Sequence, residues 1–283
     1  MIVLLKMQKN KSSFFNKNLF NSLGKRFTTS VVLFLFLYIF FNVDFFLFKI
    51  FLTILSFVAF FEWIAFLNKS FWFNILYVMI SIFSYYIFAL MPTKITIIIL
   101  FIHWLWILKV IYTYQSTRIS FNYNIFAHMI SGIAIILPIQ HAMICLYYRS
   151  MLATPFVIVV SFDAAGYFIG SAFQGKKIIP KISPNKTLSG FLGGLIISTI
   201  LGFIMILNSL RSTDSCIYLF FVVFSTACLA FIGDSFESLI KRVFKCKDSG
   251  NIFPGHGGIL DRIDSFFFSF PYFCLLLNFF SQA

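Results

Sequence analysis

Charged residues are scarce in this sequence. Only 11% of its 283 residues are Asp, Glu, Lys or Arg, whereas a soluble domain carries about 25%. Hydrophobic residues make up 60% of the chain, and the mean hydropathy is +0.94. A fold of this composition would expose large apolar patches to water. The composition therefore excludes the ordinary soluble class, and we expect lipid to be the solvent of this chain.

Cysteine pairs with metal-binding or redox spacing are also missing. The five cysteines form no CxxC pair and show no zinc-ligand spacing, so we expect neither a disulfide framework nor a cysteine metal site. A basic soluble domain is missing as well, which argues against nucleic acid as a partner. The net charge of +13 instead comes from Lys and Arg beside apolar runs, where they set topology and contact anionic lipid heads. We interpret the 43 phenylalanines as interchangeable apolar residues that face lipid.

Nine apolar stretches have about the 20 residues that a helix needs to cross a bilayer. They cover residues 31–48, 50–67, 71–91, 95–111, 125–148, 151–172, 188–208, 215–233 and 264–281. We therefore expect an all-α polytopic membrane protein with about nine transmembrane helices. Residues 1–26 would form a basic cytoplasmic tail, and residues 27–283 a single integral membrane catalytic domain.

Basic residues gather in three places: the N-terminal tail, the 176–186 loop and the 241–262 segment. Six predicted spans separate the first cluster from the second, and two separate the second from the third. Both numbers are even, so all three clusters fall on one side of the membrane. The positive-inside rule makes this side cytoplasmic. The N-terminus and the polar loops are therefore predicted to be cytoplasmic.

Acidic residues are the rarest charged type, with nine in the chain. Five of them lie between Asp234 and Asp264. Carboxylates near a membrane are costly to desolvate and usually mark ion or substrate sites. We therefore expect the active site to lie in this segment, on the cytoplasmic side.

The residue types in this segment suit a metal-bound polyphosphate. On a helix, Asp234, Glu237, Ser238 and Lys241 would share one face, because they are spaced three, four and seven residues apart. A glycine-rich loop follows at 254–258, and its backbone could approach a ligand closely. Asp261 and Asp264 would then lie one turn apart at the start of the last span. Carboxylates of this kind, with substrate phosphates, hold Mg²⁺.

Two motifs in this segment resemble the signature of the phosphatidate cytidylyltransferase (CDP-diacylglycerol synthase) family. One is S-x-x-K-R-x4-K-D from Ser238 to Asp248, and the other is PGHGG-x-x-DR-x-D from Pro254 to Asp264. Residues 233–238 resemble the GDxxES lead-in of that family. A second stretch, with Asp163 and ISPNKT at 182–187, is also similar, although residues 171–189 depart from the family pattern in places. Together the matches cover about residues 160–265.

The resemblance implies a bacterial inner-membrane enzyme that converts CTP and phosphatidate, with Mg²⁺, into CDP-diacylglycerol and pyrophosphate. It implies that Asp234 and Asp261 bind the metal, with Glu237 and Asp264 as second choices. The implied catalytic groups are Lys241, Arg242, His256 and Arg262. The implied substrate-binding residues are Lys186, Ser238, Gly257, Gly258 and Asp163. A second cation and a homodimer are left open.

Two other functions are compatible with some of these features. A CTP-dependent kinase of a polyprenol or other lipid alcohol would use the same nucleotide but transfer the γ-phosphoryl group. A membrane transporter could use the intramembrane carboxylates Glu62 and Asp163 as coupling sites. The gathering of acidic residues at one end of the spans favours an enzyme over a transporter.

Overall fold

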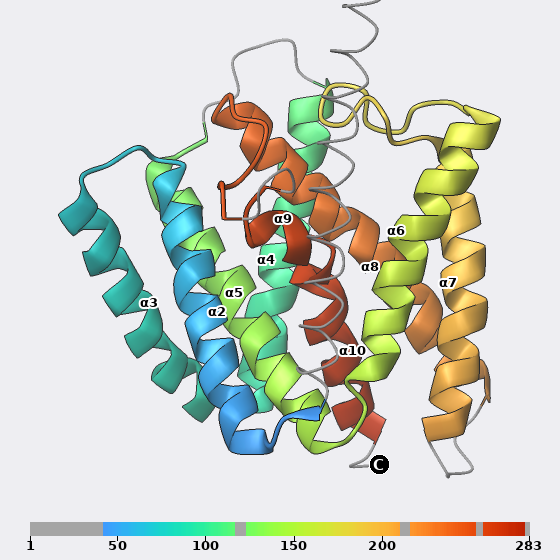
Figure 1. Ribbon diagram of the computed structural model, residues 1–283, viewed down its shortest axis with the longest axis horizontal. Helices are drawn as coiled ribbons and strands as arrows, with labels where there is room; N and C mark the ends of the chain where they lie inside the picture. The colour runs from blue at the N-terminus through green and yellow to red at the C-terminus, as the bar shows by residue number, and fades with distance from the viewer. Residues whose placement is uncertain (1–41, 117–122, 210–215, 253–256, 281–283) are drawn as a thin grey trace, which may run out of the picture.

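The computed structural model describes residues 42–116, 123–209, 216–252 and 257–280. Nearly all regular structure in these residues is α-helical, and an isolated β-bridge joins Lys177 and Thr187. The helices are α2 (Phe45–Ala65), α3 (Phe71–Leu90), α4 (Thr93–Ser116), α5 (Ile125–Tyr148), α6 (Ala153–Phe173), α7 (Leu188–Ser209), α8 (Cys216–Val243), α9 (Leu260–Ile263) and α10 (Phe266–Phe280). This arrangement confirms the all-α prediction (Figure 1).

Seven of the described helices, α2 to α8, are long and apolar enough to cross a membrane. They correspond to seven of the nine predicted spans. The last predicted span corresponds to the shorter apolar helix α10, which follows the single turn α9. The first, 31–48, lies mostly outside the described residues, so the number nine stays approximate.

The predicted break between the first two spans, at residue 49, is wrong. Helix α2 begins at Phe45, directly after Asp44, and runs through Lys49 without interruption. Lysine favours helices nearly as well as leucine does. Its long side chain can also follow an apolar surface while its charge reaches the membrane boundary. A single lysine therefore does not end an apolar helix.

Helices α6 and α7 pack against each other at very short range. Gly190 of α7 faces Gly166 and Gly170 of α6, and a Cβ atom on Gly190 would lie only 2.6 Å from the Gly166 carbonyl oxygen. Small residues allow membrane helices to approach in this way. The two helices therefore form a close pair, which fixes the loop between them (Figure 1).

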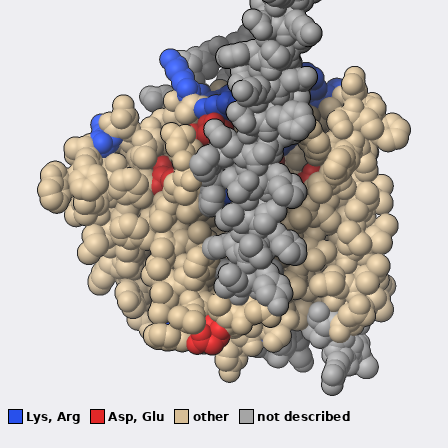
Figure 2. All heavy atoms as spheres, viewed as in Figure 1, with Lys and Arg blue, Asp and Glu red and all other residues tan. Residues whose placement is uncertain are grey.

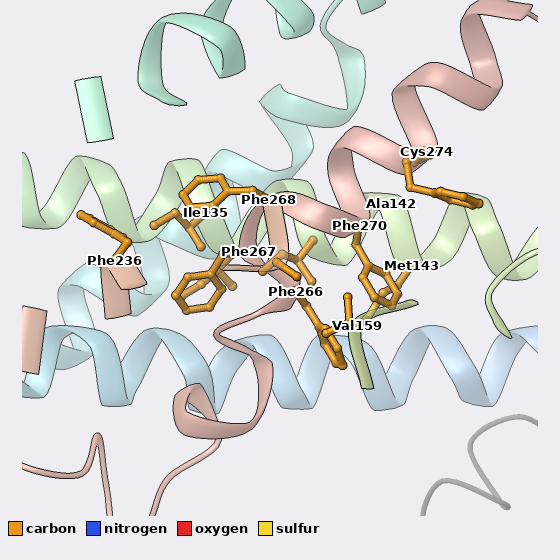
Figure 3. Packing of buried hydrophobic residues seen from close by; sticks show 14 of the residues in the cluster. Ile135, Ala142, Met143, Val159, Phe236, Phe266, Phe267, Phe268, Phe270 and Cys274 are labelled. Atoms are coloured by element: carbon orange, nitrogen blue, oxygen red, sulfur yellow. The ribbon is translucent and has the colours of Figure 1, made fainter. Parts of the chain in front are cut away.

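The centre of the molecule is filled by α10. Figure 3 shows Phe267, Phe268 and Phe270 of this helix among side chains of α5, α6 and α8. All three phenylalanines are at most 1% exposed. The interpretation of the phenylalanines as lipid-facing is therefore wrong for α10, whose rings form the protein core. It fits α3 better, where Phe71 and Phe83 are 61% and 66% exposed on a surface that lipid would cover.

The polar loops meet at one end of the bundle. The α6–α7 loop and the C-terminal end of α8 both lie at the upper end in Figure 1. Lys and Arg side chains gather at the same end on the face shown in Figure 2. Two of the three predicted basic clusters are therefore on one side of the molecule, and the third lies outside the described residues.

Candidate active site

The last turns of α8 carry four polar residues that the sequence placed on one helix face. Ser238 donates a hydrogen bond from Oγ to Asp234 Oδ1 at 3.2 Å. One turn further on, Lys241 Nζ lies 2.5 Å from Glu237 Oε2. Helix α8 remains regular from its apolar first half to these residues, so the apolar part holds the polar part in position.

Lys241 joins this helix to Asp261 in α9. Its Nζ donates to Asp261 Oδ1 at 2.7 Å while it also pairs with Glu237. The Glu237 side chain is fully buried and that of Asp261 is nearly so. Buried carboxylates need a partner charge or several donors. One lysine is therefore the shared ion-pair partner of two carboxylates that come from different helices.

Asp261 also receives hydrogen bonds from the loop that precedes α9. Its Oδ2 accepts from Ser249 N at 2.8 Å, from Ser249 Oγ at 2.9 Å and from Gly258 N at 2.8 Å. Burial works to raise the pKa of Asp261, but the bonds from Lys241, Gly258 and Ser249 outweigh it and hold that pKa below its ordinary value. Asp261 is therefore ionised and fixed by several donors.

The glycine-rich loop was expected to approach a ligand with its backbone. In its described part, Gly257 has a φ of +79°, a conformation that favours glycine, and a Cβ there would lie 2.3 Å from Asp261 Oδ2. The backbone at Gly257 thus closely approaches the carboxylate of Asp261, a residue of the protein itself. His256 lies outside the described residues, so its predicted role is untested.

The α6–α7 loop brings a second lysine to α8. Lys186 Nζ lies 2.8 Å from Asp234 Oδ2 and donates to Ser235 Oγ at 3.1 Å. Arg242 Nε donates to the carbonyl oxygen of Ile182 at 3.1 Å and so ties the same loop to the end of α8. Two segments that are distant in the sequence therefore share one polar site.

A cavity of about 240 Å³ opens beside these residues. Its walls come from α6, the α6–α7 loop, α7 and α8. Polar side chains that line it include Asp163, Lys186 and Asp234. Its apolar walls include Phe162, Phe191 and Phe231. The cavity therefore combines charged groups with a surface that suits an amphiphilic or aromatic ligand.

Asp264 lies at the junction between α9 and α10. Its Oδ1 accepts a hydrogen bond from Ser265 N at 2.8 Å. Burial raises the pKa of Asp264 well above its ordinary value, and the nearby negative charges of Asp234, Glu237 and Asp163 raise it further. Ser265, which follows Asp264 in the sequence, also holds Asp163, because its Oγ donates a hydrogen bond to Asp163 Oδ2 at 2.9 Å. Four carboxylates thus lie within electrostatic range of one another.

The structure separates the predicted site residues into groups. Asp163, Lys186 and Asp234 line the cavity, and Ser238 bonds Asp234. An adjoining network consists of Lys241, Glu237, Asp261 and Gly258.

The two predicted catalytic arginines lie elsewhere. Arg242 contacts the backbone of the α6–α7 loop, and Arg262 is exposed on α9. The predicted metal pair, Asp234 and Asp261, is therefore divided between the two groups, and Glu237 lies near both.

Two residues of the site were not predicted from the sequence. Glu62, on α2, accepts hydrogen bonds from Ile259 N and Leu260 N, both at 3.0 Å. Ser249 bonds both Glu62 and Asp261. Glu62 is a carboxylate near the end of an apolar span, and such a residue often marks a functional site. Nothing in the local sequence around Glu62, however, connects it to residues 249–260.

Comparisons with known proteins show the family of this chain. The sequence profile of the cytidylyltransferase family matches residues 24–280. The chain therefore belongs to the cytidylyltransferase family.

Among curated proteins, the chain is similar to several phosphatidate cytidylyltransferases. It is 44% identical over 125 residues to that of Bacillus subtilis, covering 44% of this chain and 46% of the relative. It is 42% identical over 129 residues to that of Haemophilus influenzae, covering 43% and 45%. For the protein of Rickettsia bellii the identity is 38% over 172 residues, covering 56% and 70%. The chain thus spans about half the length of the first two relatives.

Proposed function

We propose that this protein transfers the cytidylyl group of CTP to phosphatidate, which yields CDP-diacylglycerol and pyrophosphate. The observation that carries the proposal is the cavity between α6, α7 and α8, where Lys186 and Asp234 meet at the basic end of a membrane bundle. A lipid phosphate and a nucleotide could meet only at such a boundary. The printed names of the relatives support the same reaction.

In the proposed reaction, a phosphate oxygen of phosphatidate attacks the α-phosphorus of CTP. A new P–O bond forms, the bond from the α-phosphorus to the bridging oxygen breaks, and the electron pair leaves with pyrophosphate. Lys186 would reduce the repulsion between the two anionic substrates at the cavity. Lys241, held between Glu237 and Asp261, would face the developing charge without having to reorganise. Positioning supplies most of the remaining catalysis, because the lipid phosphate is already a nucleophile.

The residues around the cavity fit a divalent cation. Mg²⁺ is commonly bound by one or two carboxylates together with substrate phosphates. Asp234 and Asp163 line the same cavity, in an excess of negative charge that also raises the pKa of Asp264. Among the described residues no three ligand-type side chains form a complete metal cluster, so phosphates would have to complete the set. When bound, Mg²⁺ would neutralise charge on the triphosphate.

We assign Asp234 as the first metal-binding residue on this basis. For the second, Asp163 lines the same cavity, whereas Asp261 already accepts hydrogen bonds on both of its oxygens. Asp261 fits the role of fixing Lys241 better than the role of a ligand. We further propose that the enzyme resides in the inner membrane of a bacterium, with the cavity end toward the cytoplasm.

The test is an assay of purified protein in detergent with phosphatidate and CTP labelled at either the α- or the γ-phosphorus. Cytidylyl transfer puts the α label into lipid and releases the γ label as pyrophosphate. A lipid kinase would put the γ label into lipid and release CDP, and this result would overturn the proposal. Chelation of divalent cations should abolish the reaction, and added Mg²⁺ should restore it.

Asp234→Asn is the decisive variant in this assay. We expect transfer to fall by roughly 10²–10³-fold, because the cavity loses a charge that the transition state requires. Asp44→Asn, at the far end of α2, is the matched control and should keep wild-type activity. Near-normal transfer by Asp234→Asn would contradict the assignment of this residue.

A further inference from the structure

We infer that Glu62 is a positioning residue for the proposed transfer: it holds the loop before α9 and thereby the orientation of Asp261. This inference rests on the proposed function for its catalytic consequence. The contact itself is a feature of the fold. Glu62 belongs to α2, far from the 233–264 segment in the sequence, and it does not line the cavity.

The Glu62 carboxylate is bonded entirely by the segment around α9. Oε1 accepts from Ile259 N at 3.0 Å, and Oε2 accepts from Leu260 N at 3.0 Å and from Ser249 Oγ at 3.1 Å. The residue is only 5% exposed. Among the described residues no Lys, Arg or His forms an ion pair with it. Within the described part of the chain, its hydrogen-bond donors therefore all come from Ser249, Ile259 and Leu260.

The loop is shaped to receive this carboxylate. A Cβ atom on Gly258 would lie 2.4 Å from Glu62 Oε2, and one on Gly250 would lie 2.6 Å from Oε1. Side chains at these two positions would therefore displace Glu62. The glycines leave room for an acceptor that comes from another helix.

Ser249 connects Glu62 to Asp261. Its Oγ lies 3.1 Å from Glu62 Oε2 and 2.9 Å from Asp261 Oδ2. A hydroxyl has a single proton, so the Ser249 hydroxyl donates to one carboxylate at a time. The backbone N–H of Ser249 donates to Asp261 in either case. Two carboxylates from different helices, α2 and α9, thus bind the same serine, and Asp261 also accepts a hydrogen bond from Lys241.

The end of α2 is itself fixed, so Glu62 can act as a rigid support. Trp63 Nε1 donates to the carbonyl oxygen of His128 at 2.8 Å, and His128 Nε2 donates to that of Trp63 at 2.7 Å. The two rings stack with centroids 4.8 Å apart. This reciprocal contact locks α2 to α5. Groups that hold reacting residues are effective when they stand on rigid elements.

Glu62→Gln tests the inference, because the amide keeps the size of the side chain but turns one of its two acceptors into a donor. We expect kcat to fall about 10–100-fold, as for other supporting groups, while the KM for CTP stays within about threefold. Hydrogen exchange of the Ile259 and Leu260 amides should become at least about tenfold faster. The exchange measurement requires no activity, so it decides the contact even if the proposed reaction is wrong.

Tyr77→Phe is the matched comparator, since it loses one hydrogen bond, from the Tyr77 hydroxyl to the carbonyl oxygen of Met129, but leaves Glu62 and the contact between Trp63 and His128 in place. It should lower the midpoint of thermal unfolding and leave kcat and the exchange of these two amides near wild type. The inference is overturned if Glu62→Gln keeps wild-type kcat and exchange. It is overturned equally if Glu62→Gln loses stability and activity only as Tyr77→Phe does.

Ser249→Ala covers the case in which Glu62→Gln does not accumulate as folded protein. It removes one hydroxyl between the two carboxylates and is a smaller change. We expect kcat to fall roughly fivefold to tenfold, with an unchanged KM for CTP. A wild-type kcat for Ser249→Ala, together with unchanged exchange at residues 258–261, would overturn the inference.

Discussion

Lys241 has a larger structural role at the residue scale than a surface lysine would have. It is the partner of Glu237, whose side chain is fully buried, and of Asp261, whose side chain is 7% exposed. Exposed ion pairs contribute little to stability, whereas removal of one partner from a buried pair leaves an uncompensated charge. Lys241 is therefore expected to stabilise the fold as well as to serve the proposed chemistry.

Lys241→Met should lower the free energy of unfolding by about 3–5 kcal/mol. The methionine fills similar space but leaves both carboxylates without their cation. Thermal and denaturant unfolding in detergent would measure the loss. The double variant Lys241→Met/Glu237→Gln should recover part of it, because one of the two unpaired charges is then removed. No recovery in the double variant would show that Glu237 is stabilised by other groups.

Asp264 predicts a pH dependence of stability. Its pKa is raised by burial and by neighbouring carboxylates, so the folded protein holds a proton that the unfolded chain has released. Between the ordinary carboxyl pKa and the raised one, stability must therefore fall as pH rises. Asp261, with its lowered pKa, acts in the opposite sense but only at more acidic pH.

Asp264→Asn should flatten this dependence. With divalent cations chelated, the unfolding midpoint of the wild type should fall as the pH rises from the ordinary carboxyl pKa toward the raised pKa of Asp264. The variant should lose that part of the slope, because asparagine has no proton to release. Parallel wild-type and variant curves over this range would contradict the assignment of the raised pKa.

At the scale of elements, the α6–α7 pair determines where Lys186 lies. The loop between these helices supplies this lysine to Asp234, and its position depends on how closely α6 and α7 approach. The contact at Gly190 is the tightest of those between glycines of the two helices. A wider spacing would move the loop away from α8.

Gly190→Ala should therefore be destabilising, by about 1–3 kcal/mol, and should also reduce CTP-to-lipid transfer. The added methyl group would lie 2.6 Å from the Gly166 carbonyl oxygen. Gly166→Ala is the matched control for stability, because its nearest neighbour would lie at an ordinary 3.4 Å. It should be neutral or gain up to about 1 kcal/mol from helix propensity. Equal stability of the two variants, measured by thermal unfolding, would refute close packing as the cause.

The elements differ in how well the sequence predicts them. Helix α8 was predictable, because its apolar run and the spacing of Asp234, Ser238 and Lys241 have the same helical period. Helix α10 was predictable as an apolar segment but not as a core element. An apolar run in a membrane protein does not tell lipid-facing from protein-facing residues. The bond between Glu62 and Leu260 spans 198 positions, and no local pattern encodes such a contact.

At the scale of the whole molecule, the bundle has two chemically different ends. The cavity and two basic clusters lie at one end, at the C-terminus of α8. The chain's own cysteines mark both ends of this helix. Cys216, exposed, begins α8, and Cys246, half-buried, follows its last turn.

Membrane-impermeant thiol reagents should therefore report the orientation in a bacterial host. If the cavity end is cytoplasmic, Cys216 is labelled from outside and Cys246 only in inverted vesicles. Burial raises the pKa of the Cys246 thiol, so alkaline conditions are needed for its labelling. Cys216→Ser and Cys246→Ser identify which sulfur carries the label. Labelling of Cys246 from outside would reverse the proposed topology.

The tie between Glu62 and the loop before α9 also bears on how the protein is made. Ser249 is 187 positions after Glu62, so the ribosome has released most of the later helices before the donors for this carboxylate exist. During that interval the inserted α2 carries an acid without its final partners, which is costly in a membrane. Docking of the loop supplies the hydrogen-bond donors of Glu62 and so removes this cost. Catalytic competence would then be acquired last, as the signal that insertion of the bundle is complete.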